Sequence, residues 1–447
     1  MTQRLFLIKT FGCKVNQCES AFMIESLLSH GYRLAQPGEE AEVCIVHGCA
    51  VTSRASYESR QALYQFRKRY PNAVAYVFTG CAAHYEGLSL AEQHIVTHVL
   101  GNTEKLDIVK FLENPATPER PLVAVSDPRD CAHGSMKPIG YTRMFGERSR
   151  AFIKIQDGCD AFCSYCIVPY MRGGRRSLAP EVVAEQIRSM VMAGYNEVVL
   201  TGIHLGQWGQ DLSPPQNILD LLRFLDEQEV KPPRLRLSSL EPTECSPELI
   251  DFLKDKDWFC HHFHVPLQSG SSEILRLMSR HYDPKFYAEV VGLIRTVFSD
   301  AAIGADVIVG FPGESKEMFE ETYRLIEALP ITYLHVFPYS PRKGTPAAEL
   351  KGFVSGPEIR RRASILRNLG IEKKRAFMVS QIGRTLSVVL ESPLQRDVWR
   401  ATSDNYLPVL VFPEGKVLQK GDLVQVRVVD IDHTRFMLVG RLVGVDL

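Results

Sequence analysis

The sequence has no excess of either charge and no long apolar segment. Its 52 Lys and Arg residues equal its 52 Asp and Glu residues, so any basic surface that binds nucleic acid must be local. No run of about 18 apolar residues occurs, which predicts that no helix spans a membrane. The first residues, MTQRLFLIKTFGC, have a short apolar run broken by Lys9, which is not typical of a secretory signal. We therefore expect a cytoplasmic protein with no membrane partner.

Internal repeats, low-complexity segments and the GxxxxGK[ST] motif are also missing, so ATP-driven chemistry is not supported. The chain does contain eleven cysteines. Because thiols stay reduced in the cytoplasm, these cysteines favour metal or redox chemistry over disulfides. With 447 residues, of which 45% are apolar and 23% charged, the chain is predicted to form two or three globular domains.

The first part of the chain alternates apolar runs with helical patterns. The runs are typical of buried parallel strands, with helices between them: strands at 4–10, 42–48 and 74–80, helices at 19–32 and 54–70. This alternation predicts an α/β domain over residues 1–127. Residues 128–148 are rich in Pro, Gly and charge and have no periodicity, which predicts a linker.

A second alternation follows the linker. Its six strand candidates lie at 150–156, 197–203, 234–240, 262–268, 303–311 and 333–340. Six βα units fall short of eight, so we predict an open, partial (β/α)6 barrel over residues 149–376. A basic segment at 358–375 is predicted to be helical. Residues 377–447 contain short strands between turn signals, which predicts a small all-β barrel. The fold class is therefore α/β with a C-terminal β-barrel.

Three cysteines lie close together in the stretch CDAFCSYC: Cys159, Cys163 and Cys166. An iron–sulfur cluster of four irons has four corners, each normally bound by a thiolate, so three thiolates leave one iron open to a non-protein ligand. The neighbouring Tyr165 is positioned to contact a bound cofactor ring. The alternative is a zinc site, with a remote fourth ligand taken from three histidines: His261, His262 and His264.

The stretch CDAFCSYC resembles the CxxxCxΦC loop of radical S-adenosylmethionine enzymes, where Φ is an aromatic residue. The resemblance implies that the amino and carboxylate groups of S-adenosylmethionine bind the open iron. It also implies that an electron from the cluster cleaves the sulfonium and produces a 5′-deoxyadenosyl radical. The cofactor, and no protein side chain beyond the cluster ligands, would then carry the radical chemistry.

Cys13, Cys49 and Cys81 each follow a predicted strand of the first domain. The carboxyl ends of parallel strands meet at one edge of a sheet, where ligands bind. A second three-thiolate cluster is therefore plausible, and the alternative is three incidental buried thiols. Cys18, in the helix after Cys13, is a competing ligand, whereas Cys44 lies in mid-strand and is expected to be a core thiol.

The resemblance extends over essentially the whole chain. The segments that carry it are TFGCKVNQCES, GCAVTSRAS, TGCAA, GNTEK, RAFIKIQDGCDAFCSYCIVPYMRGGRRS, HVPLQSGS, DVIVGFPGE and HVFPYSPRKGT. They are similar to the methylthiotransferases, in which a methylthiotransferase domain, a radical enzyme core and a TRAM domain follow in that order. The sequence departs from the family pattern at three places. His47-Gly48 precedes the second cysteine where the family usually has Asn-Thr, His84 stands where Gln is common, and position 18 is a cysteine.

The family resemblance implies two [4Fe-4S] clusters, bound by Cys13, Cys49 and Cys81 and by Cys159, Cys163 and Cys166, together with S-adenosylmethionine. The motif GCKVNQ is similar to the corresponding motif in the family branch that modifies N6-threonylcarbamoyladenosine at position 37 of transfer RNA. This implies methylthiolation at C2, with two S-adenosylmethionine molecules used. Alternatives are isopentenyladenosine in transfer RNA and an aspartate of a ribosomal protein. A redox-sensing RNA-binding protein is an alternative of another class.

Contacts to S-adenosylmethionine are predicted at the ends of later strands. The candidates are Tyr165, Thr201, Gly202, Ser238, Ser239, Glu241 and Gln268. The glycine-rich turn TGIHLGQWG lacks the spacing of a dinucleotide fingerprint, so an ordinary turn is an equal alternative.

Two basic segments are candidates for contact with transfer RNA, through its anticodon stem-loop. Their residues are Arg172, Arg175 and Arg176 beside the cluster loop, and Arg360, Arg361, Arg362, Lys373, Lys374 and Arg375 in the basic helix. The alternative for the helix is a solvated face. In the helix at 54–70, basic residues alternate with aromatic ones that could stack on RNA bases; we favour the alternative, a solvated basic face with the aromatic side chains in the core. An electron donor protein is a further expected partner.

Overall fold

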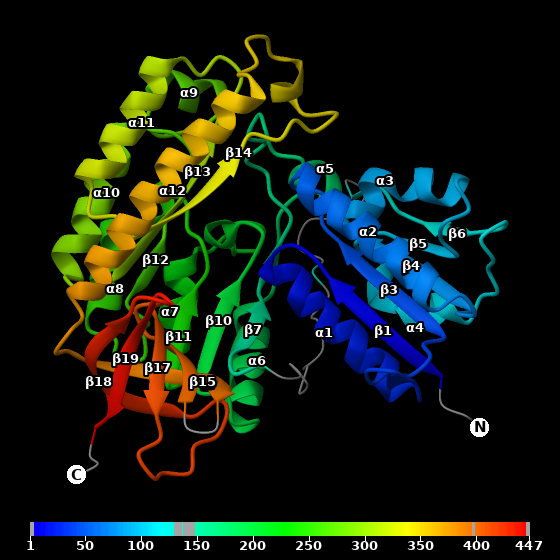
Figure 1. Cartoon of the computed structure of the whole chain (residues 1–447), viewed down its shortest axis with the longest axis horizontal. Helices are drawn as coiled ribbons and strands as arrows, with labels where there is room; N and C mark the ends of the chain where they lie inside the picture. The colour runs from blue at the N-terminus through cyan, green and yellow to red at the C-terminus, as the bar shows by residue number, and fades with distance from the viewer. Residues whose placement is uncertain (1–3, 129–135, 137–147, 396–397, 444–447) are drawn as a thin grey trace.

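The computed structural model describes residues 4–128, 136, 148–395 and 398–443. Most of the predicted linker, residues 129–135 and 137–147, lies outside them. No helix in the described part of the chain is long and apolar enough to cross a bilayer. Figure 1 shows an N-terminal α/β unit beside a larger barrel, with a small β-barrel beneath the larger one.

The N-terminal unit contains a six-stranded sheet in the order β2-β1-β3-β4-β5-β6, and all its strand pairs are parallel. Its strands are β1 (Leu5–Thr10), β2 (Arg33–Leu34), β3 (Val43–Gly48), β4 (Ala75–Gly80), β5 (His98–Leu100) and β6 (Leu122–Ala124). Helices α1 (Lys14–Ser29), α2 (Ser53–Arg69), α3 (Cys81–Glu92) and α4 (Ile108–Leu112) connect them. The three predicted strands are confirmed, and α1 starts earlier than predicted. The short strands β2, β5 and β6 were not predicted.

Six parallel strands form the open barrel, as predicted, in two sheets of order β11-β10-β7 and β12-β13-β14. They are β7 (Ala151–Lys154), β10 (Glu197–Thr201), β11 (Arg234–Leu237), β12 (His262–His264), β13 (Ala302–Val309) and β14 (Tyr333–Pro338). Backbone hydrogen bonds join the two sheets, from Leu240 N to His264 O at 3.0 Å and from Cys260 N to Leu235 O at 2.9 Å. The predicted strand 150–156 is divided, because β8 (Gln156–Asp157) turns away to pair with β9 (Arg176–Ser177).

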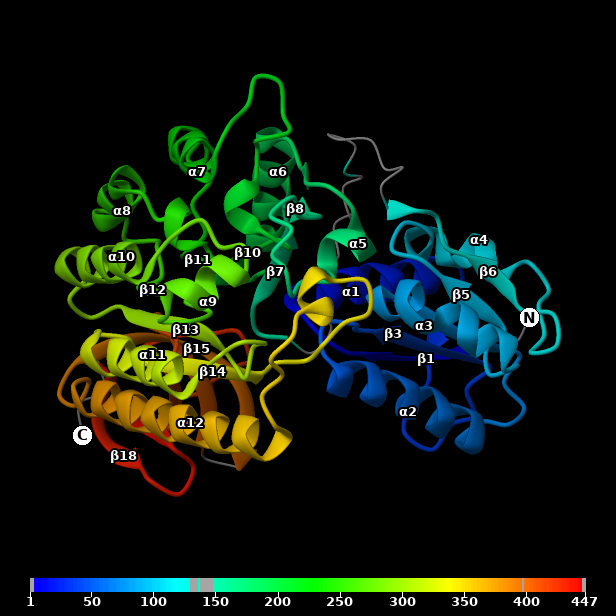
Figure 2. The ribbon, with the colours of Figure 1, turned by 90° about the horizontal axis from the view of Figure 1, so that it is seen from above.

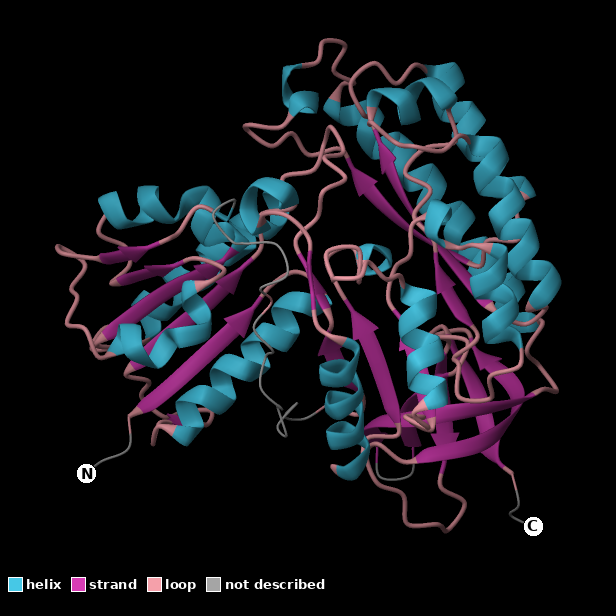
Figure 3. Cartoon of the chain, turned by 180° about the vertical axis from the view of Figure 1, so that it is seen from behind, coloured by secondary structure: helices cyan, strands magenta, loops and turns pink. Residues whose placement is uncertain are grey.

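Helices cover the outside of this barrel (Figure 3). They are α6 (Pro180–Met192), α7 (Ile218–Glu227), α8 (Pro247–Lys254), α9 (Ser272–Leu277), α10 (Pro284–Val297), α11 (Lys316–Ala328) and α12 (Gly356–Val379). Their apolar faces and the strands bury one large core. The predicted basic helix is confirmed as part of α12. A short helix, α5 (Val168–Arg172), lies with α1 between the barrel and the N-terminal sheet in Figure 2.

The C-terminal strands close into a barrel in the order β15-β16-β17-β19-β18, as predicted. They are β15 (Thr385–Gln395), β16 (Val398–Ser403), β17 (Pro408–Phe412), β18 (Leu423–Asp432) and β19 (Met437–Leu442). This barrel contacts the amino ends of the larger barrel's strands. The Arg236 guanidinium donates to Asp404 O at 2.8 Å and Ser403 O at 3.1 Å. The opposite, carboxyl ends of those strands are therefore left to form a site.

Candidate active site

The barrel triad, defined as Cys159, Cys163 and Cys166, lies in the loop after β8. Local backbone contacts shape this loop: Cys166 N donates to Cys163 O at 2.9 Å, and Cys159 N donates to Gly173 O at 3.1 Å. The thiols are near enough to interact. Burial, together with Cys163 and Cys159, raises the pKa of Cys166 to about 12.

The sheet triad, defined as Cys13, Cys49 and Cys81, also comes together. Cys13 is the N-cap of α1, Cys49 follows β3, and Cys81 begins α3. Gly12 has φ of +96°, and a Cβ there would lie 2.9 Å from Cys49 Sγ, so only glycine fits. Burial raises the pKa of Cys49 to about 12, and Cys81 and Cys13 add to the shift.

Cys18 and Cys44 are two further cysteines of this domain, and Cys18 is near enough to Cys13 for the two thiols to interact. The Cys18 thiol donates to Phe152 O at 3.5 Å, toward the barrel strand β7. Cys44 is fully buried inside β3, as expected for a core thiol. The structure therefore gives Cys18 a packing contact of its own, and Cys13 is the cysteine of α1 that joins Cys49 and Cys81.

The spacing within both triads favours a cluster over a single ion. Among the described residues, the one group of three potential ligand atoms lying within 4.8 Å of each other is His264, Asp306 and His335. Thiolates around one zinc ion would be roughly 3.8 Å apart, from a Zn–S bond near 2.3 Å. In each cysteine triad at least one pair of thiols is therefore farther apart than 4.8 Å, a spacing that a multi-iron cluster is wide enough to bridge.

The histidines considered as zinc ligands have other partners. His261 Nδ1 lies 2.9 Å from Asp300 Oδ1, and His262 Nε2 lies 2.7 Å from the Tyr333 hydroxyl. His264 lies between Ser239 and Asp306, at 2.5 Å and 3.0 Å. Each of these three histidines therefore has a described hydrogen-bond partner other than the barrel triad.

A cavity of about 200 Å³ lies between the barrel and the sheet triad's domain. Cys166 and Ile167 line it from the cluster loop, and Val51 and Thr52, just after Cys49, line it from the N-terminal unit. The remaining lining residues come from the barrel strands and loops: Tyr165, Gln268, Asp306, Ile308, Phe337, Pro338, Tyr339 and Ser340. A substrate atom in this cavity would lie beside Cys166 of the barrel triad and beside the segment that follows Cys49 of the sheet triad.

Two of the predicted cofactor contacts line this cavity, Tyr165 and Gln268. Gln268 has φ of +64°, a strained conformation that is enriched at functional sites. The others lie at strand ends and do not line it. Thr201 O accepts from Ile155 N at 2.9 Å, and Ser238 N donates to Leu200 O at 3.0 Å. A Cβ at Gly202 would lie 2.8 Å from Gln156 Oε1, so this turn is tightly packed.

The remaining candidates, Ser239 and Glu241, have side-chain partners. Ser239 bonds to His264, as described above, and Glu241 forms an ion pair with Arg280. Arg280 was not predicted, although it also donates to Cys163 Sγ at 3.2 Å. His204, likewise not predicted, lies 3.3 Å from Cys159 Sγ and 2.6 Å from Glu244. Burial lowers the His204 pKa, but these two partners raise it to about 10 overall.

Arg172 was predicted to contact RNA, and this prediction is wrong. Its side chain is buried, at 1% relative exposure. It donates to Glu19 and Asp157, both at 2.9 Å, and to Asn16 at 2.8 Å. Because α5 turns inward, Arg172 reaches α1 instead of the surface. The prediction for Arg176 is wrong as well, because β9 turns this side chain inward: it is 9% exposed and lies 3.5 Å from Asp157.

Arg172 belongs to a buried ionic cluster that joins the N-terminal unit to the barrel. Glu19 also accepts from Lys105 at 2.6 Å and from Lys154 at 2.7 Å. The cluster contains four cations and two carboxylates: Lys105, Lys154, Arg172, Arg176, Glu19 and Asp157. It also lies beside the sheet triad, where Arg172 opposes the burial that raises the pKa of Cys13. Thiolates in the triad would offset the excess positive charge.

The basic residues of α12 divide between surface and interior. Arg360, Arg361 and Arg375 are exposed. Arg362 is 4% exposed and pairs with Glu314 at 2.6 Å, so its predicted RNA contact is wrong as well: the helix turns it onto the core. Lys373 donates to Leu329 O at 2.8 Å, and Lys374 lies over the Phe436 ring at 5.4 Å. Arg175, near the cluster loop, is partly exposed and pairs with Asp160 at 3.2 Å.

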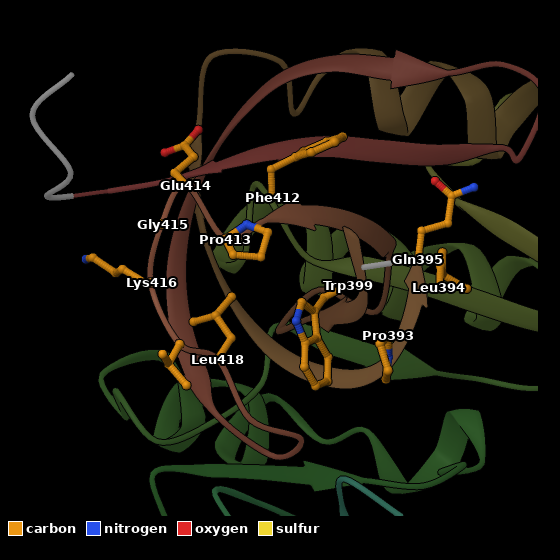
Figure 4. Close-up of a pocket in the computed structure, with 11 residues that line it drawn as sticks. Pro393, Leu394, Gln395, Trp399, Phe412, Pro413, Glu414, Gly415, Lys416 and Leu418 are labelled. Carbon is orange, nitrogen blue, oxygen red and sulfur yellow. The ribbon is translucent and has the colours of Figure 1, made fainter. Parts of the chain in front are cut away.

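A larger hollow of about 790 Å³ lies on the C-terminal barrel, away from both triads. Figure 4 shows Trp399, Phe412 and Leu418 around it, with Lys416 at its rim. Aromatic side chains beside a lysine are suited to stacking on unpaired bases. The aromatic residues Tyr57 and Tyr64 of α2 are also exposed, in contrast to the predicted core role for that helix.

Two family models match the chain. The model of the radical SAM superfamily matches residues 153–326, and that of the uncharacterized protein family UPF0004 matches residues 5–101. These ranges contain the barrel triad and the sheet triad, respectively.

Curated relatives match nearly the whole chain. The threonylcarbamoyladenosine tRNA methylthiotransferase MtaB of Aquifex aeolicus is 35% identical over 403 residues, covering 90% of this chain and 95% of the relative. The MtaB of Bacillus subtilis is 33% identical, covering 94% and 92%. A tRNA-2-methylthio-N(6)-dimethylallyladenosine synthase of Clostridium botulinum is 30% identical, covering 97% and 96%.

A solved structure shares the fold. The radical S-adenosylmethionine methyltransferase TsrM of Kitasatospora setae, with cobalamin and a [4Fe-4S] cluster bound, superposes with a TM-score of 0.55 at 16% identity. The match covers 78% of this chain and 77% of that one. The likeness therefore extends beyond the barrel.

Proposed function

This chain belongs to the radical S-adenosylmethionine tRNA methylthiotransferases, and we propose that it methylthiolates C2 of N6-threonylcarbamoyladenosine at position 37 of transfer RNA. The family is enzymatic and uses [4Fe-4S] clusters and S-adenosylmethionine. In our proposal the enzyme uses two clusters and two molecules of S-adenosylmethionine. It acts in the cytoplasm, with the anticodon stem-loop and an electron donor protein as partners.

The observation that supports the proposal most is the cavity that the loop of the barrel triad shares with the segment after Cys49. Cys166 of the barrel triad lines it, and Val51 and Thr52 follow Cys49 of the sheet triad. The barrel triad would hold one [4Fe-4S] cluster and the sheet triad the other. The chemistry these groups supply is reductive cleavage of S-adenosylmethionine at the barrel and delivery of a methylated sulfur at the sheet.

The residues of the chain bind, orient and shield the reactants. Tyr165 and Gln268 line the cavity, and we propose that they contact the adenosyl group of S-adenosylmethionine. Arg280, with its hydrogen bond to Cys163, would stabilise the thiolate form of that ligand. The buried Arg172 does the same near the sheet triad. The cavity is narrow and partly apolar, which limits the access of water to a radical.

Contacts to transfer RNA are proposed on exposed cations and aromatic rings. Of the predicted residues, Arg175, Arg360, Arg361 and Arg375 keep exposed or partly exposed guanidinium groups. The hollow around Trp399 and Phe412 offers stacking surfaces on the C-terminal barrel. These groups would hold the stem-loop while position 37 enters the cavity.

The test is mass spectrometry of nucleosides after anaerobic incubation of the reconstituted enzyme. The reaction contains S-adenosylmethionine, dithionite and transfer RNA from cells that lack this enzyme. A 2-methylthio form of threonylcarbamoyladenosine is the expected product. Isopentenyladenosine transfer RNA is the parallel substrate, since relatives that are 30% identical carry that activity in their names. Product from that substrate alone would contradict the proposal, as would modification of a ribosomal-protein aspartate alone.

A further inference from the structure

A second space lies between the N-terminal unit and the barrel, and the function described above does not use it. This interdomain hollow has a volume of about 690 Å³. Ser53, Ser56 and Arg60 of α2 line one side, and Arg342 and Lys343, from the loop after β14, line the other. Consecutive residues of the chain line the 200 Å³ cavity and this hollow. Thr52 lines the cavity and the next residue, Ser53, lines the hollow.

The two sides of the hollow are bonded to each other at this junction. Ser53 N donates to the Ser340 hydroxyl at 2.9 Å, and the Ser53 and Ser340 hydroxyls also lie 2.9 Å apart. Lys343 N donates to the Tyr85 hydroxyl at 3.3 Å. These contacts hold the loop after β14 against α2 and α3. Hydrogen bonds between the two units therefore fix the walls of the hollow.

Arg342 is the unusual residue of the interdomain hollow. Its side chain is 3% exposed, yet its Nε and Nη2 atoms have no hydrogen-bond partner among the described residues. Only Nη1 donates, to Ser56 Oγ at 3.4 Å, while the guanidinium lies 5.2 Å from the centre of the Tyr85 ring. No described carboxylate forms an ion pair with it. A buried cation with no counter-charge and a single long hydrogen bond is costly, by several kcal/mol.

The other charges of the interdomain hollow also favour an anion. Arg60, Arg342 and Lys343 carry positive charge, and the single lining carboxylate, Glu86, is paired with Arg60. Burial lowers the pKa of His84 to about 4, so its imidazole is neutral. Ser53 is the first residue of the 17-residue helix α2, whose amino end adds a partial positive charge.

We propose that Arg342 and the interdomain hollow bind a backbone phosphate of the substrate RNA, next to the nucleotide that enters the 200 Å³ cavity. The Nε and Nη2 atoms form the edge of a guanidinium that binds a phosphate through two parallel hydrogen bonds. A nucleotide that leaves its stack loses stacking energy, and a fixed phosphate beside it helps to hold the extruded conformation. This inference rests on the proposed function, because it takes transfer RNA as the substrate.

The experiment compares wild-type enzyme with Arg342→Met and Arg342→Lys, and uses Arg188→Met as the matched control. Arg188 is an exposed arginine of α6 that lines neither the 200 Å³ cavity nor the interdomain hollow. Two quantities are measured for each protein. One is the affinity for transfer RNA over a range of salt concentrations. The other is the shift in melting temperature caused by inorganic phosphate, relative to chloride at equal ionic strength.

We expect Arg342→Met to weaken transfer RNA binding about ten- to a hundredfold, which is the loss expected for charge-assisted hydrogen bonds to one phosphate. The slope of log affinity against log salt should fall by about one. Phosphate should raise the melting temperature of the wild type and of Arg188→Met but not of Arg342→Met. Arg342→Lys keeps the charge without the paired donors, so its affinity should fall in between.

Two outcomes would overturn the inference. If phosphate protection depends on Arg342 while affinity and salt slope match the control, the hollow binds a free phosphate and not RNA. If neither quantity changes, the hollow is not an anion site. Should Arg342→Met fail to fold, Lys343→Met provides the same test, because Lys343 lines the hollow from the surface. A failure of the proposed function looks different: transfer RNA would bind through Arg342, yet no methylthio-nucleoside would form.

Discussion

The two cysteine triads reach their geometry by different routes. The barrel triad lies within one eight-residue loop, CDAFCSYC, so local backbone hydrogen bonds set its spacing. The cysteines of the sheet triad are far apart in the sequence: Cys13 caps α1, Cys49 follows β3 and Cys81 begins α3. Its spacing depends on the register of the sheet and on the ionic cluster around Glu19. The barrel triad is therefore a local feature, whereas the sheet triad is a property of the folded domain.

The sharpest way to separate the triads is to remove one ligand from each. Cys159→Ala should abolish formation of 5′-deoxyadenosine and of product, because the barrel triad would bind the cluster that cleaves S-adenosylmethionine. Cys49→Ala should retain 5′-deoxyadenosine formation and lose methylthiolation. Both products are quantified by mass spectrometry, with Cys44→Ala, a core thiol, as control. Full methylthiolation by Cys49→Ala would mean that the sheet triad is not a cluster site.

Glu19→Gln should weaken the ionic cluster beside the sheet triad without replacing a cysteine. Glu19 neutralises Lys105, Lys154 and Arg172 in a buried site. Removing its charge leaves Lys105 without a carboxylate partner among the described residues. Lys154 and Arg172 then share Asp157 alone, at a cost of about 3–5 kcal/mol in the free energy of unfolding. Urea denaturation measures this loss.

The control for Glu19→Gln is Glu58→Gln, whose partner Arg54 is exposed, so a change of at most about 1 kcal/mol is expected. Iron bound at the sheet triad should also fall in Glu19→Gln, while the barrel triad keeps its iron. Equal losses of stability in the two variants would contradict the role of the ionic cluster.

Arg280→Met tests the barrel triad in the same way. The substitution removes the 3.2 Å hydrogen bond to Cys163, which is a contact to a charged group when the thiolate forms. Iron release to a chelator from the barrel triad should accelerate roughly tenfold, as expected for about 1.5 kcal/mol. Arg276→Met, which removes an exposed ion pair of α9, should release iron at the wild-type rate. An equal acceleration at the sheet triad would show that Arg280 acts on the whole fold.

Asn102→Ala should have the smallest effect. Asn102 donates to Met171 O at 2.8 Å and accepts from Lys105 at 2.7 Å, so it links the sheet domain to α5. Losing these neutral or partly compensated hydrogen bonds should cost about 1 kcal/mol of unfolding free energy. A loss as large as that of Glu19→Gln would mean that hydrogen bonding, rather than charge, dominates this interface.

The difference between the triads also explains what the sequence could predict. Long apolar runs were sufficient for β3 and β4, whose residues are all buried. The strands β2, β5 and β6 contain two or three residues, too few for any periodicity. They form because neighbouring strands supply hydrogen-bond partners.

The wrong predictions of RNA contacts for basic residues also come from interactions between residues that are far apart in the sequence. Arg172 and its partner Glu19 are 153 positions apart, so no local pattern indicates their contact. Arg362 lies in a basic run of α12, but its burial depends on a contact with Glu314, which lies in the loop before α11. Arg342 lies in a polar turn, YSPRKGT, which gives no sign of burial. Its burial against Tyr85 comes from docking of the two units.

The most direct test of the central claim is the iron content of the reconstituted protein, measured together with its low-temperature EPR spectrum. Two clusters require about eight irons per chain in the wild type. About four should remain when all three cysteines of either triad are replaced by alanine, with a different EPR signal surviving in each variant. If the wild type binds only about four irons, or if replacing Cys13, Cys49 and Cys81 leaves the iron content unchanged, the account of two facing triads is wrong.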